Sequence, residues 1–228
     1  MIIDVVIPAY NEVNTIARVV GDIDKSLVRF VVVADNNSTD GTAEVARAAG
    51  AVVVKETEQG YGAACLKGIE YLMVQPVQPD IVAFLDGDYS DYPEQLIQVV
   101  QPILDGKCEM VIGSRALGQR EAGSMMPQQR FGNWLATTMI RVLYKARFTD
   151  LGPFRAITTP ALKRIRMCDR NYGWTVEMQV KAAKEKITFQ EVPVDYRQRG
   201  AGQSKVAGTV KGTILAGWKI ISTILKYA

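Results

Sequence analysis

Short apolar runs alternate with segments of helical pattern along the first half of the chain. Five runs are apolar almost without interruption, at 2–7, 30–34, 51–54, 81–85 and 110–112. Helices are predicted between them, at about 12–25, 40–49, 61–74 and 93–105. Continuous rather than alternating apolar character is typical of strands that are buried on both faces. The pattern therefore predicts an α/β fold, with a mostly parallel, Rossmann-like open sheet flanked by helices.

The second half is less regular. Residues 113–127 are rich in glycine and charge, which predicts a loop over the edge of the sheet. Helices are predicted near 128–147, 160–167 and 174–185, with a turn at "TDLGPFRA" between the first two. A strand is predicted in "ITFQEVPVDY", followed by the basic, glycine-rich "RQRGAGQSK" and a helix to the end of the chain.

The last helix has two distinct faces. Apolar side chains recur at steps of three or four along one face: Val206, Val210, Ile214, Trp218, Ile221 and Leu225. Lys211, Lys219 and Lys226 gather on another face. Such a helix either packs on the domain with its lysines in solvent or lies on a membrane surface. We therefore divide the chain into a domain at 1–205 and a C-terminal amphipathic helix at 206–228, for which a membrane interface is one of the two interpretations.

The composition of the chain excludes several classes of catalytic site, metal site and partner. The 228 residues are enough for one sizeable domain, and a net charge of only +3 gives no reason to expect a nucleic-acid partner. The absence of histidine excludes catalysis by a Ser–His or Cys–His pair and every histidine-ligated metal. Scattered cysteines without CxxC spacing, and the lack of a signal peptide or a bilayer-long apolar run, predict a cytoplasmic protein that is soluble or peripheral on the cytoplasmic membrane face.

Three carboxylates crowd together after the fourth predicted strand, in "LDGDYSD". Ligands of open α/β sheets bind beyond the carboxyl ends of the strands, so this loop belongs to the predicted site. Asp86 and Asp88 can grip one Mg²⁺ or Mn²⁺ ion, and Gly87 lets the backbone approach a ligand closely. Such a cation stabilises the charge that develops on a departing diphosphate. Asp40 and Asp91 stand where helices begin, and we predict that they cap those helices.

Basic residues are predicted at the same edge of the sheet. Arg115 follows the fifth strand, and Arg197, Arg199 and Lys205 flank glycines in the segment before the last helix. Guanidinium groups and the backbone amides of a glycine-rich loop are suited to a polyphosphate. Taken alone, this run of basic residues could equally be a solvated surface loop. The predicted metal-binding carboxylates on another loop at the same edge favour a phosphate site.

Six segments occur in the order expected of a known enzyme family: "VVIPAYNE", "ADNNSTDGT", "GYGAACLKGIE", "FLDGDYSDYPE", "IGSR" and "VPVDYRQRGAGQSK". On these segments, which extend from Ile3 to about Lys205, the chain resembles the family 2 glycosyltransferases of the GT-A fold. Within that family it is most similar to the dolichyl- and polyprenyl-phosphate sugar synthases. The resemblance implies a hexosyltransferase with a nucleotide-sugar donor, a divalent metal and inversion at the anomeric carbon.

The resemblance also implies roles at matching positions. Residues expected to frame the nucleotide are Pro8, Tyr10, Glu12, Val33 and Asp35. Asp86 and Asp88 would hold the metal on the diphosphate, with Gly87 close by. Residues expected to contact phosphates of the donor or acceptor are Arg115, Arg199 and Lys205. Asp150 to Arg155 resembles an Asp-x-x-x-x-Arg turn near the acceptor, so the implied catalytic set is Asp88, Arg115, Asp150 and Arg199.

Three departures from the family pattern leave the substrates open. Asn36-Asn37 replaces the more usual Asp-Gly after the second strand, so that the donor is either a UDP- or a GDP-hexose. Ser90 stands where mannosyl members often carry Gln, which argues against GDP-mannose. Leu-Gly-Pro replaces small polar residues before Phe154, at the acceptor end.

The predicted reaction is transfer of a hexose to a polyprenyl phosphate, which is ionised near neutral pH and needs no base. The main alternative is transfer to a sugar or other hydroxyl, which needs a carboxylate base within hydrogen-bond reach; Asp91, Asp150 and Glu177 are the candidates. A non-catalytic sugar- or lipid-binding module is a further alternative, against which the intact acidic and basic motifs argue. A sugar-nucleotide pyrophosphorylase is disfavoured, because "IPAYNE" lacks a glycine-rich nucleotide loop.

Overall fold

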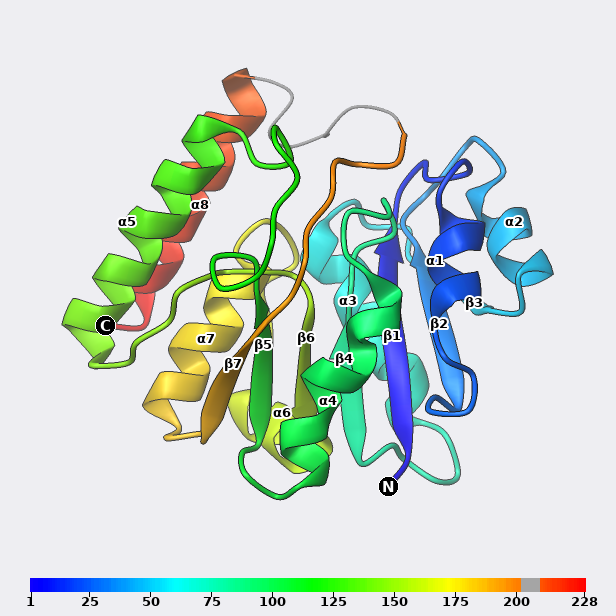
Figure 1. The fold of residues 1–228 in the computed structure, drawn as a ribbon, viewed down its shortest axis with the longest axis horizontal. Helices are drawn as coiled ribbons and strands as arrows, with labels where there is room; N and C mark the ends of the chain where they lie inside the picture. The colour runs from blue at the N-terminus through cyan, green and yellow to red at the C-terminus, as the bar shows by residue number, and fades with distance from the viewer. Residues whose placement is uncertain (202–209) are drawn as a thin grey trace.

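The protein is described by a computed structural model over residues 1–201 and 210–228. Its centre is a seven-stranded sheet with the order β3-β2-β1-β4-β6-β5-β7 (Figure 1). The strands are β1 (Ile3–Ala9), β2 (Phe30–Asp35), β3 (Val52–Lys55), β4 (Ile81–Phe84), β5 (Met110–Ser114), β6 (Arg155–Thr158) and β7 (Phe189–Pro193). Paired strands are parallel except at β6, which is antiparallel to β4 and β5. The predicted mostly parallel α/β sheet is confirmed.

Helices cover both faces of the sheet. One face carries α1 (Ile16–Asp22), α2 (Thr42–Ala48) and α4 (Leu96–Leu104), which a 3₁₀ turn at Pro93–Gln95 precedes. The other face carries α3 (Tyr61–Met73), α5 (Pro127–Tyr144), α6 (Thr159–Ile165), α7 (Trp174–Lys184) and α8 (Val210–Lys226). In the part of the chain that the structure describes, no helix is both long and apolar enough to cross a membrane.

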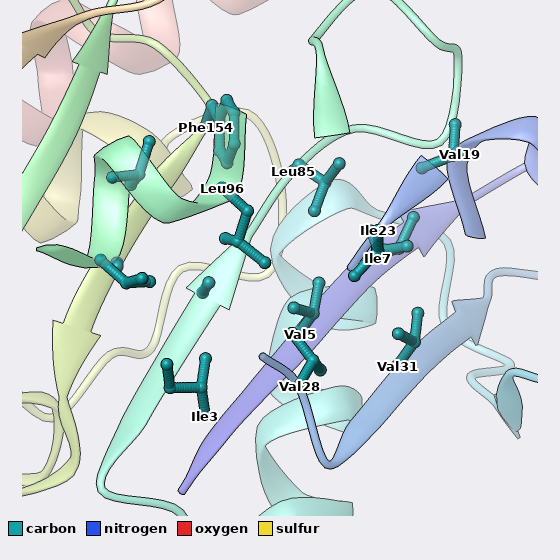
Figure 2. Packing of buried hydrophobic residues seen from close by; sticks show 14 of the residues in the cluster. Ile3, Val5, Ile7, Val19, Ile23, Val28, Val31, Leu85, Leu96 and Phe154 are labelled. Atoms are coloured by element: carbon teal, nitrogen blue, oxygen red, sulfur yellow. The ribbon is translucent and has the colours of Figure 1, made fainter. Parts of the chain in front are cut away.

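The central strand β1 contributes to both cores because successive side chains of a strand point to opposite faces. Ile3, Val5 and Ile7 pack with α1 and α4 on one side (Figure 2). Val6 points to the other side and packs under α3, where Gly68 faces it. The near-continuous apolar character of this strand is therefore explained by burial on both faces.

We expect Gly68→Ala to destabilise the protein by about 1–3 kcal/mol, as overpacking of a core does. A Cβ atom at Gly68 would lie 2.4 Å from Cγ1 of Val6, so that α3 would have to move away from β1. Gly21 in α1 is the matched control, because nothing lies within 4 Å of a Cβ there. Gly21→Ala should change stability by less than about 1 kcal/mol, towards higher stability. Urea unfolding measures both, and equal stability of the two variants would contradict close packing of α3 on β1.

One strand is missing from the sequence-based prediction. Strand β6 begins inside the predicted turn "TDLGPFRA" and inserts between β4 and β5. Four residues between a Gly-Pro turn and a helix are too few to show a strand period. The strand is instead specified by its pairing with two strands that are distant in the sequence.

The terminal helix α8 packs beside α5 and α7, but through a different face from the apolar one predicted. Among the side chains of this helix that the structure describes, Thr223 and Ile224 are buried. Trp218 and Leu225, which belong to the predicted apolar face, are 71% and 56% exposed. Val206, the first member of that face, lies outside the described residues. Two members of the apolar face are therefore turned outwards, while Ile221 is half-buried.

Candidate functional site

The carboxyl ends of β1, β2 and β4 meet at one edge of the sheet, because these strands are parallel neighbours. Pro8 is buried near the end of β1, and Tyr10 is exposed just beyond it. Asp35 ends β2, is 5% exposed and accepts a hydrogen bond from the amide of Ser38 (3.2 Å). Val33 is fully buried in the core within β2, so the structure does not bring its side chain to this edge.

The turn after β4 carries the two carboxylates that were predicted to hold a metal. Oδ1 of Asp86 accepts a hydrogen bond from the Tyr61 hydroxyl (2.9 Å). Oδ1 of Asp88 accepts hydrogen bonds from the amide and the hydroxyl of Ser90 (2.9 and 2.6 Å). Gly87 is buried between them, and its carbonyl accepts a hydrogen bond from the Thr15 hydroxyl (2.8 Å). Neutral donors thus orient both carboxylates before any ligand binds.

Asp40 and Asp91, the two residues predicted to cap helices, make different contacts in the structure. Asp40 accepts a hydrogen bond from the amide of Thr42, the first residue of α2 (3.0 Å), although Gly41 is the N-cap residue. The prediction for Asp91 is wrong, because its side chain does not cap the helix and turns back under the turn at Asp86–Asp88, called the metal turn below for its proposed ligands. Oδ2 of Asp91 accepts a hydrogen bond from the amide of Asp86 (3.2 Å), and Oδ1 is buried without a hydrogen-bond partner.

Negative charge is concentrated at this turn. Burial, together with the charges of Asp88 and Asp91, raises the pKa of Asp86 well above its ordinary value. Burial is also the main cause that raises the pKa of Asp91 to about 7. A cation at Asp86 and Asp88 would relieve this repulsion, so the donor set suits a hard divalent ion. Over residues 1–201 and 210–228, no three acidic or cysteine side chains form a metal-binding group.

Arg199 crosses over the turn and bridges two of the predicted site residues. Its guanidinium donates to Oδ2 of Asp88 (2.9 Å) and to Oε1 of Glu12. The backbone follows the same course, since the amide of Gly200 donates to the carbonyl of Asp88 (3.0 Å). These contacts bring together Glu12, Asp88 and Arg199, three predicted site residues from distant segments. Lys205, predicted for the same loop, lies outside the described residues.

Arg197, in the same segment, has a different environment. Its guanidinium lies between the rings of Tyr89 and Tyr92, 3.5 and 3.9 Å from their centroids. It donates to the carbonyls of Tyr89 (2.8 Å) and Asp91 (3.1 Å). These contacts hold the 197–201 segment against the metal turn, so Arg197 anchors that segment and leaves Arg199 as its charged group at the carboxylates.

Arg115 and Asp150 form one buried ion pair. The Arg115 side chain donates to both carboxylate oxygens of Asp150 at 2.7 Å, and its amide donates to Oδ2 at 2.8 Å. The side chains are 12% and 1% exposed. Burial alone would raise the pKa of Asp150, but the Arg115 guanidinium holds it below its ordinary value. Asp150 is therefore an ion-pair partner whose oxygens are already engaged, a poor proton acceptor.

The predicted Asp-x-x-x-x-Arg turn does not contain an aspartate–arginine pair. Arg155 is fully buried, and its guanidinium donates to the carbonyls of Leu151, Gly152 and Thr175. Burial lowers the pKa of Arg155 to about 10. Its role in this structure is to close the turn at the start of β6.

Glu177 is held in a structural cluster. Its carboxylate accepts hydrogen bonds from the amides of Cys168 (3.0 Å) and Asp169 (2.8 Å) and from the Tyr227 hydroxyl (2.8 Å), and it pairs with Lys181 (2.9 Å). Burial alone would raise the pKa of Glu177, but a hydrogen bond from the Cys168 thiol (2.9 Å) and the contacts of Lys181, Asp169 and Tyr227 lower it to about 2. All these contacts engage the carboxylate and tie α7 to Tyr227, the residue after α8, so Glu177 is unsuited to remove a proton from an acceptor.

Tyr61 was not assigned a role from the sequence. It begins α3, between two glycines whose close contacts set its position. A Cβ at Gly60 or Gly62 would lie 2.0 Å from the carbonyl oxygen of Arg170 or Asp169. The signal available in the sequence was the pair of glycines around a tyrosine in "GYGAACLKGIE", which indicates close backbone approach.

The chain matches a family model, known sequences and solved structures. The family model described as "Glycosyl transferase family 2" matches residues 4–166. An uncharacterized glycosyltransferase of Mycobacterium tuberculosis is 34% identical over 224 residues, covering 96% of this chain and 98% of that protein. A dolichyl-phosphate hexose transferase of Haloferax volcanii is 30% identical over 224 residues, covering 97% and 93%. The solved glucosyl-3-phosphoglycerate synthase of M. tuberculosis, in complex with Mn²⁺, UDP and glucosyl-3-phosphoglycerate, has a TM-score of 0.77 at 22% identity, covering 99% of this chain and 79% of that one.

Proposed function

This chain belongs to glycosyl transferase family 2, and we propose that it transfers a hexose from a nucleotide-diphosphate sugar to a polyprenyl phosphate. The observation that carries the proposal is the cluster at the end of β4. Asp86 and Asp88 are oriented by neutral donors, and the Arg199 guanidinium lies against Asp88. Opposite charges meet there at the sheet edge where ligands of α/β folds bind.

In this proposal Asp86 and Asp88 hold Mg²⁺ or Mn²⁺ together with the donor diphosphate. The bound ion supplies positive charge beside the leaving group. The raised pKa of Asp86 and the unpartnered buried oxygen of Asp91 support a cation at this turn. The relative of known structure was solved with Mn²⁺ and UDP, which is the same combination of ligands.

The donor nucleotide would lie along the ends of β1 and β2. Pro8, Tyr10 and Asp35 border that edge, and Asp35 is the proposed partner of the base or ribose. Arg199 would exchange its carboxylate partners for the diphosphate when the donor binds, because a guanidinium forms forked hydrogen bonds with phosphate as well as with carboxylate oxygens. Lys205 is proposed to contact phosphate from the same loop.

The proposed acceptor is an anion that needs no general base. Asp150 is paired with Arg115, Glu177 is engaged in a structural cluster, and Asp91 is 1% exposed beneath the metal turn. An ionised phosphate oxygen could attack the anomeric carbon directly as the bond to the donor diphosphate breaks, with inversion. The name of the Haloferax relative is consistent with a lipid-phosphate acceptor. The enzyme would then work at the cytoplasmic face of a membrane.

A hydroxyl acceptor is the second candidate. The observation that favours it is the pKa of about 7 at Asp91, which is suited to a general base if a substrate reaches it. The solved M. tuberculosis relative is named a glucosyl-3-phosphoglycerate synthase and was solved with glucosyl-3-phosphoglycerate, a glucosyl derivative of a small molecule.

The deciding experiment measures release of nucleoside diphosphate from UDP- and GDP-hexoses. Each donor is offered with Mn²⁺ or Mg²⁺ and with a short-chain polyprenyl phosphate, the matching prenol, 3-phosphoglycerate or no acceptor. Release that requires both metal and the lipid phosphate supports the proposal and identifies the donor. Metal-dependent release with phosphoglycerate and not with the lipid would instead establish the hydroxyl acceptor. No release from any donor would contradict both.

We expect Tyr61→Phe to weaken Mn²⁺ binding in the presence of the donor diphosphate by about 10–100-fold. Its hydroxyl orients Asp86 at 2.9 Å, and loss of such an outer partner typically costs this much metal affinity. Electron paramagnetic resonance of free Mn²⁺ measures binding without turnover. Tyr71→Phe is the matched control, since Tyr71 lies in the same helix with its ring against Phe30. Unchanged binding in Tyr61→Phe would remove this residue from the metal site.

A further inference from the structure

Helices α5 and α8 expose large apolar side chains along their lengths. Fourteen such side chains are exposed in the part of the chain that the structure describes, and eight belong to these two helices or to the N-cap of α5. The eight are Met126, Phe131, Trp134, Val142, Leu143, Leu215, Trp218 and Leu225. Scattered exposed apolar residues are ordinary, but a concentration on two neighbouring helices marks an interaction surface.

Most of these side chains face away from the domain. On α5 the buried residues are Ala136, Thr137 and Ile140. Phe131 and Val142 lie on the opposite side of the helix at 3.6 residues per turn. The rings of Phe131 and Trp134 lie 5.7 Å apart. On α8 the exposed Trp218 and Leu225 lie opposite the face that is buried on the domain.

The helices form one continuous layer. They run side by side in the same direction at one end of the molecule (Figure 1). The Tyr144 hydroxyl, at the end of α5, donates to the carbonyl of Ile224 in α8 (2.5 Å). Lys219 of α8 pairs with Asp169 in the loop before α7 (2.9 Å), which fixes α8 further. The outward surfaces of α5 and α8 can therefore meet one flat partner together.

The charges on α5 and α8 indicate which kind of partner this surface binds. Neither helix contains an aspartate or a glutamate, while α5 carries Arg130 and Arg141 and α8 ends with Lys226. Lys145 and Arg147 follow α5 directly. A second copy of the chain would bring two surfaces without acidic groups together, leaving these cations without opposite charges across the contact. Tryptophan and phenylalanine beside arginine and lysine are instead typical of a surface that lies in the headgroup region of an anionic membrane.

The inward side of α5 contacts the loop that contains Asp150. The side chain of Asn133 in α5 accepts a hydrogen bond from the amide of Leu151 (2.8 Å) and donates to the carbonyl of Thr149 (3.0 Å). These residues flank Asp150, the partner of Arg115. The N-terminal ends of α5 and α8 lie at the end of the molecule where the parallel strands have their carboxyl ends (Figure 1). A membrane on the two helices would therefore lie on the side of the molecule where α5 holds the 149–151 loop.

We infer that the outward face of α5 and α8 is a docking surface for an anionic lipid bilayer, with both helices lying in the plane of the membrane interface. The exposed aromatic and aliphatic side chains enter the headgroup region, and the basic residues contact lipid phosphates. Docking itself does not depend on the proposed reaction. Delivery of a membrane-borne acceptor to the neighbouring loops does rest on that proposed function.

The test uses the full chain with vesicles of phosphatidylglycerol and phosphatidylcholine in equal parts, and with vesicles of phosphatidylcholine alone. The chain has three tryptophans, and Trp174 is buried in the core, so a change in emission reports on Trp134 and Trp218. We expect a blue shift and co-sedimentation with the anionic vesicles, both weakened by salt. Absence of binding to either kind of vesicle would overturn the inference, whatever the outcome of the donor screen.

Vesicle binding of two double variants tests whether the outward face of α5 and α8 is the surface that binds the membrane. The double variant Trp134→Ala/Trp218→Ala should bind anionic vesicles at least about tenfold more weakly, because two interfacial anchors are lost. Val74→Ala/Val77→Ala is the control, since these exposed side chains lie beyond α3, and it should bind like the parent protein. Equal binding of both double variants would overturn the inference. A dimer in solution that the tryptophan variant dissociates would also overturn it, by assigning the surface to a second copy.

Discussion

Asp88→Asn is expected to lower the release of nucleoside diphosphate by about 10²–10³-fold, with the fold retained. The carboxylate is proposed to bind the metal, and it also accepts a hydrogen bond from the Arg199 guanidinium at 2.9 Å. The amide keeps the size of the side chain but loses the charge, so both the cation and Arg199 lose their partner at the diphosphate. Removal of one such preorganised electrostatic contact typically costs about 2.7–4 kcal/mol in the transition state.

The control for this prediction is Asp105→Asn. Asp105 lies at the end of α4 distant from the site and pairs with Lys107 on the surface (2.9 Å), so its variant should turn over at the parent rate. Thermal unfolding of both variants excludes a general loss of structure as the cause. A folded Asp88→Asn protein with near-normal turnover would remove Asp88 from the mechanism.

Glu177→Gln is expected to lower the free energy of unfolding by about 3 kcal/mol at pH 7, without a comparable loss of turnover. The pKa of Glu177 is lowered from 4.5 to about 2, and each unit corresponds to about 1.4 kcal/mol of preference for the charged form. A depressed pKa in the folded state stabilises the protein fully above the unfolded value of 4.5. That contribution is lost as the pH falls from 4.5 towards 2.

Urea unfolding of the parent protein and the variant at several pH values tests the assignment, because the glutamine cannot titrate. The difference in unfolding free energy should be constant above about pH 5 and should shrink below it. Glu44→Gln, at a side chain that is 75% exposed, serves as the control and should show little difference at any pH. A large loss of turnover with unchanged stability would instead make Glu177 a catalytic base.

The acidic part of the candidate site could be predicted from the sequence. Apolar runs that end in polar residues, in a chain of alternating strands and helices, place those residues at one edge of a parallel sheet. Asp86, Asp88 and Asp35 lie there for this reason. The polar contacts of each group could not be predicted in the same way, because they join residues that are distant in the chain. Arg115 and Asp150, predicted as separate contributors, are one ion pair.

The contacts of Asp91 could not be predicted from its neighbours in the sequence either. Its position before a proline suggested a helix cap, which is a local property. The structure turns it under Asp86 because Arg197, from the segment after β7, holds the carbonyl of Asp91 (3.1 Å) and stacks on the neighbouring tyrosines. Tertiary contacts therefore override a local preference, and no pattern near Asp91 indicates them.

The sequence by itself determined the fold class, the order of the strands and helices up to β5, and the identity of the acidic turn, because these depend on periodicity and on local turn chemistry. Only the tertiary structure decided where β6 inserts and how the charges pair. It also decided which side of α8 is buried. Periodicity identifies an apolar stripe on a helix, but the side that packs depends on the surface that α5 and α7 offer, and here Thr223 and Ile224 fit that surface while Trp218 is left outside.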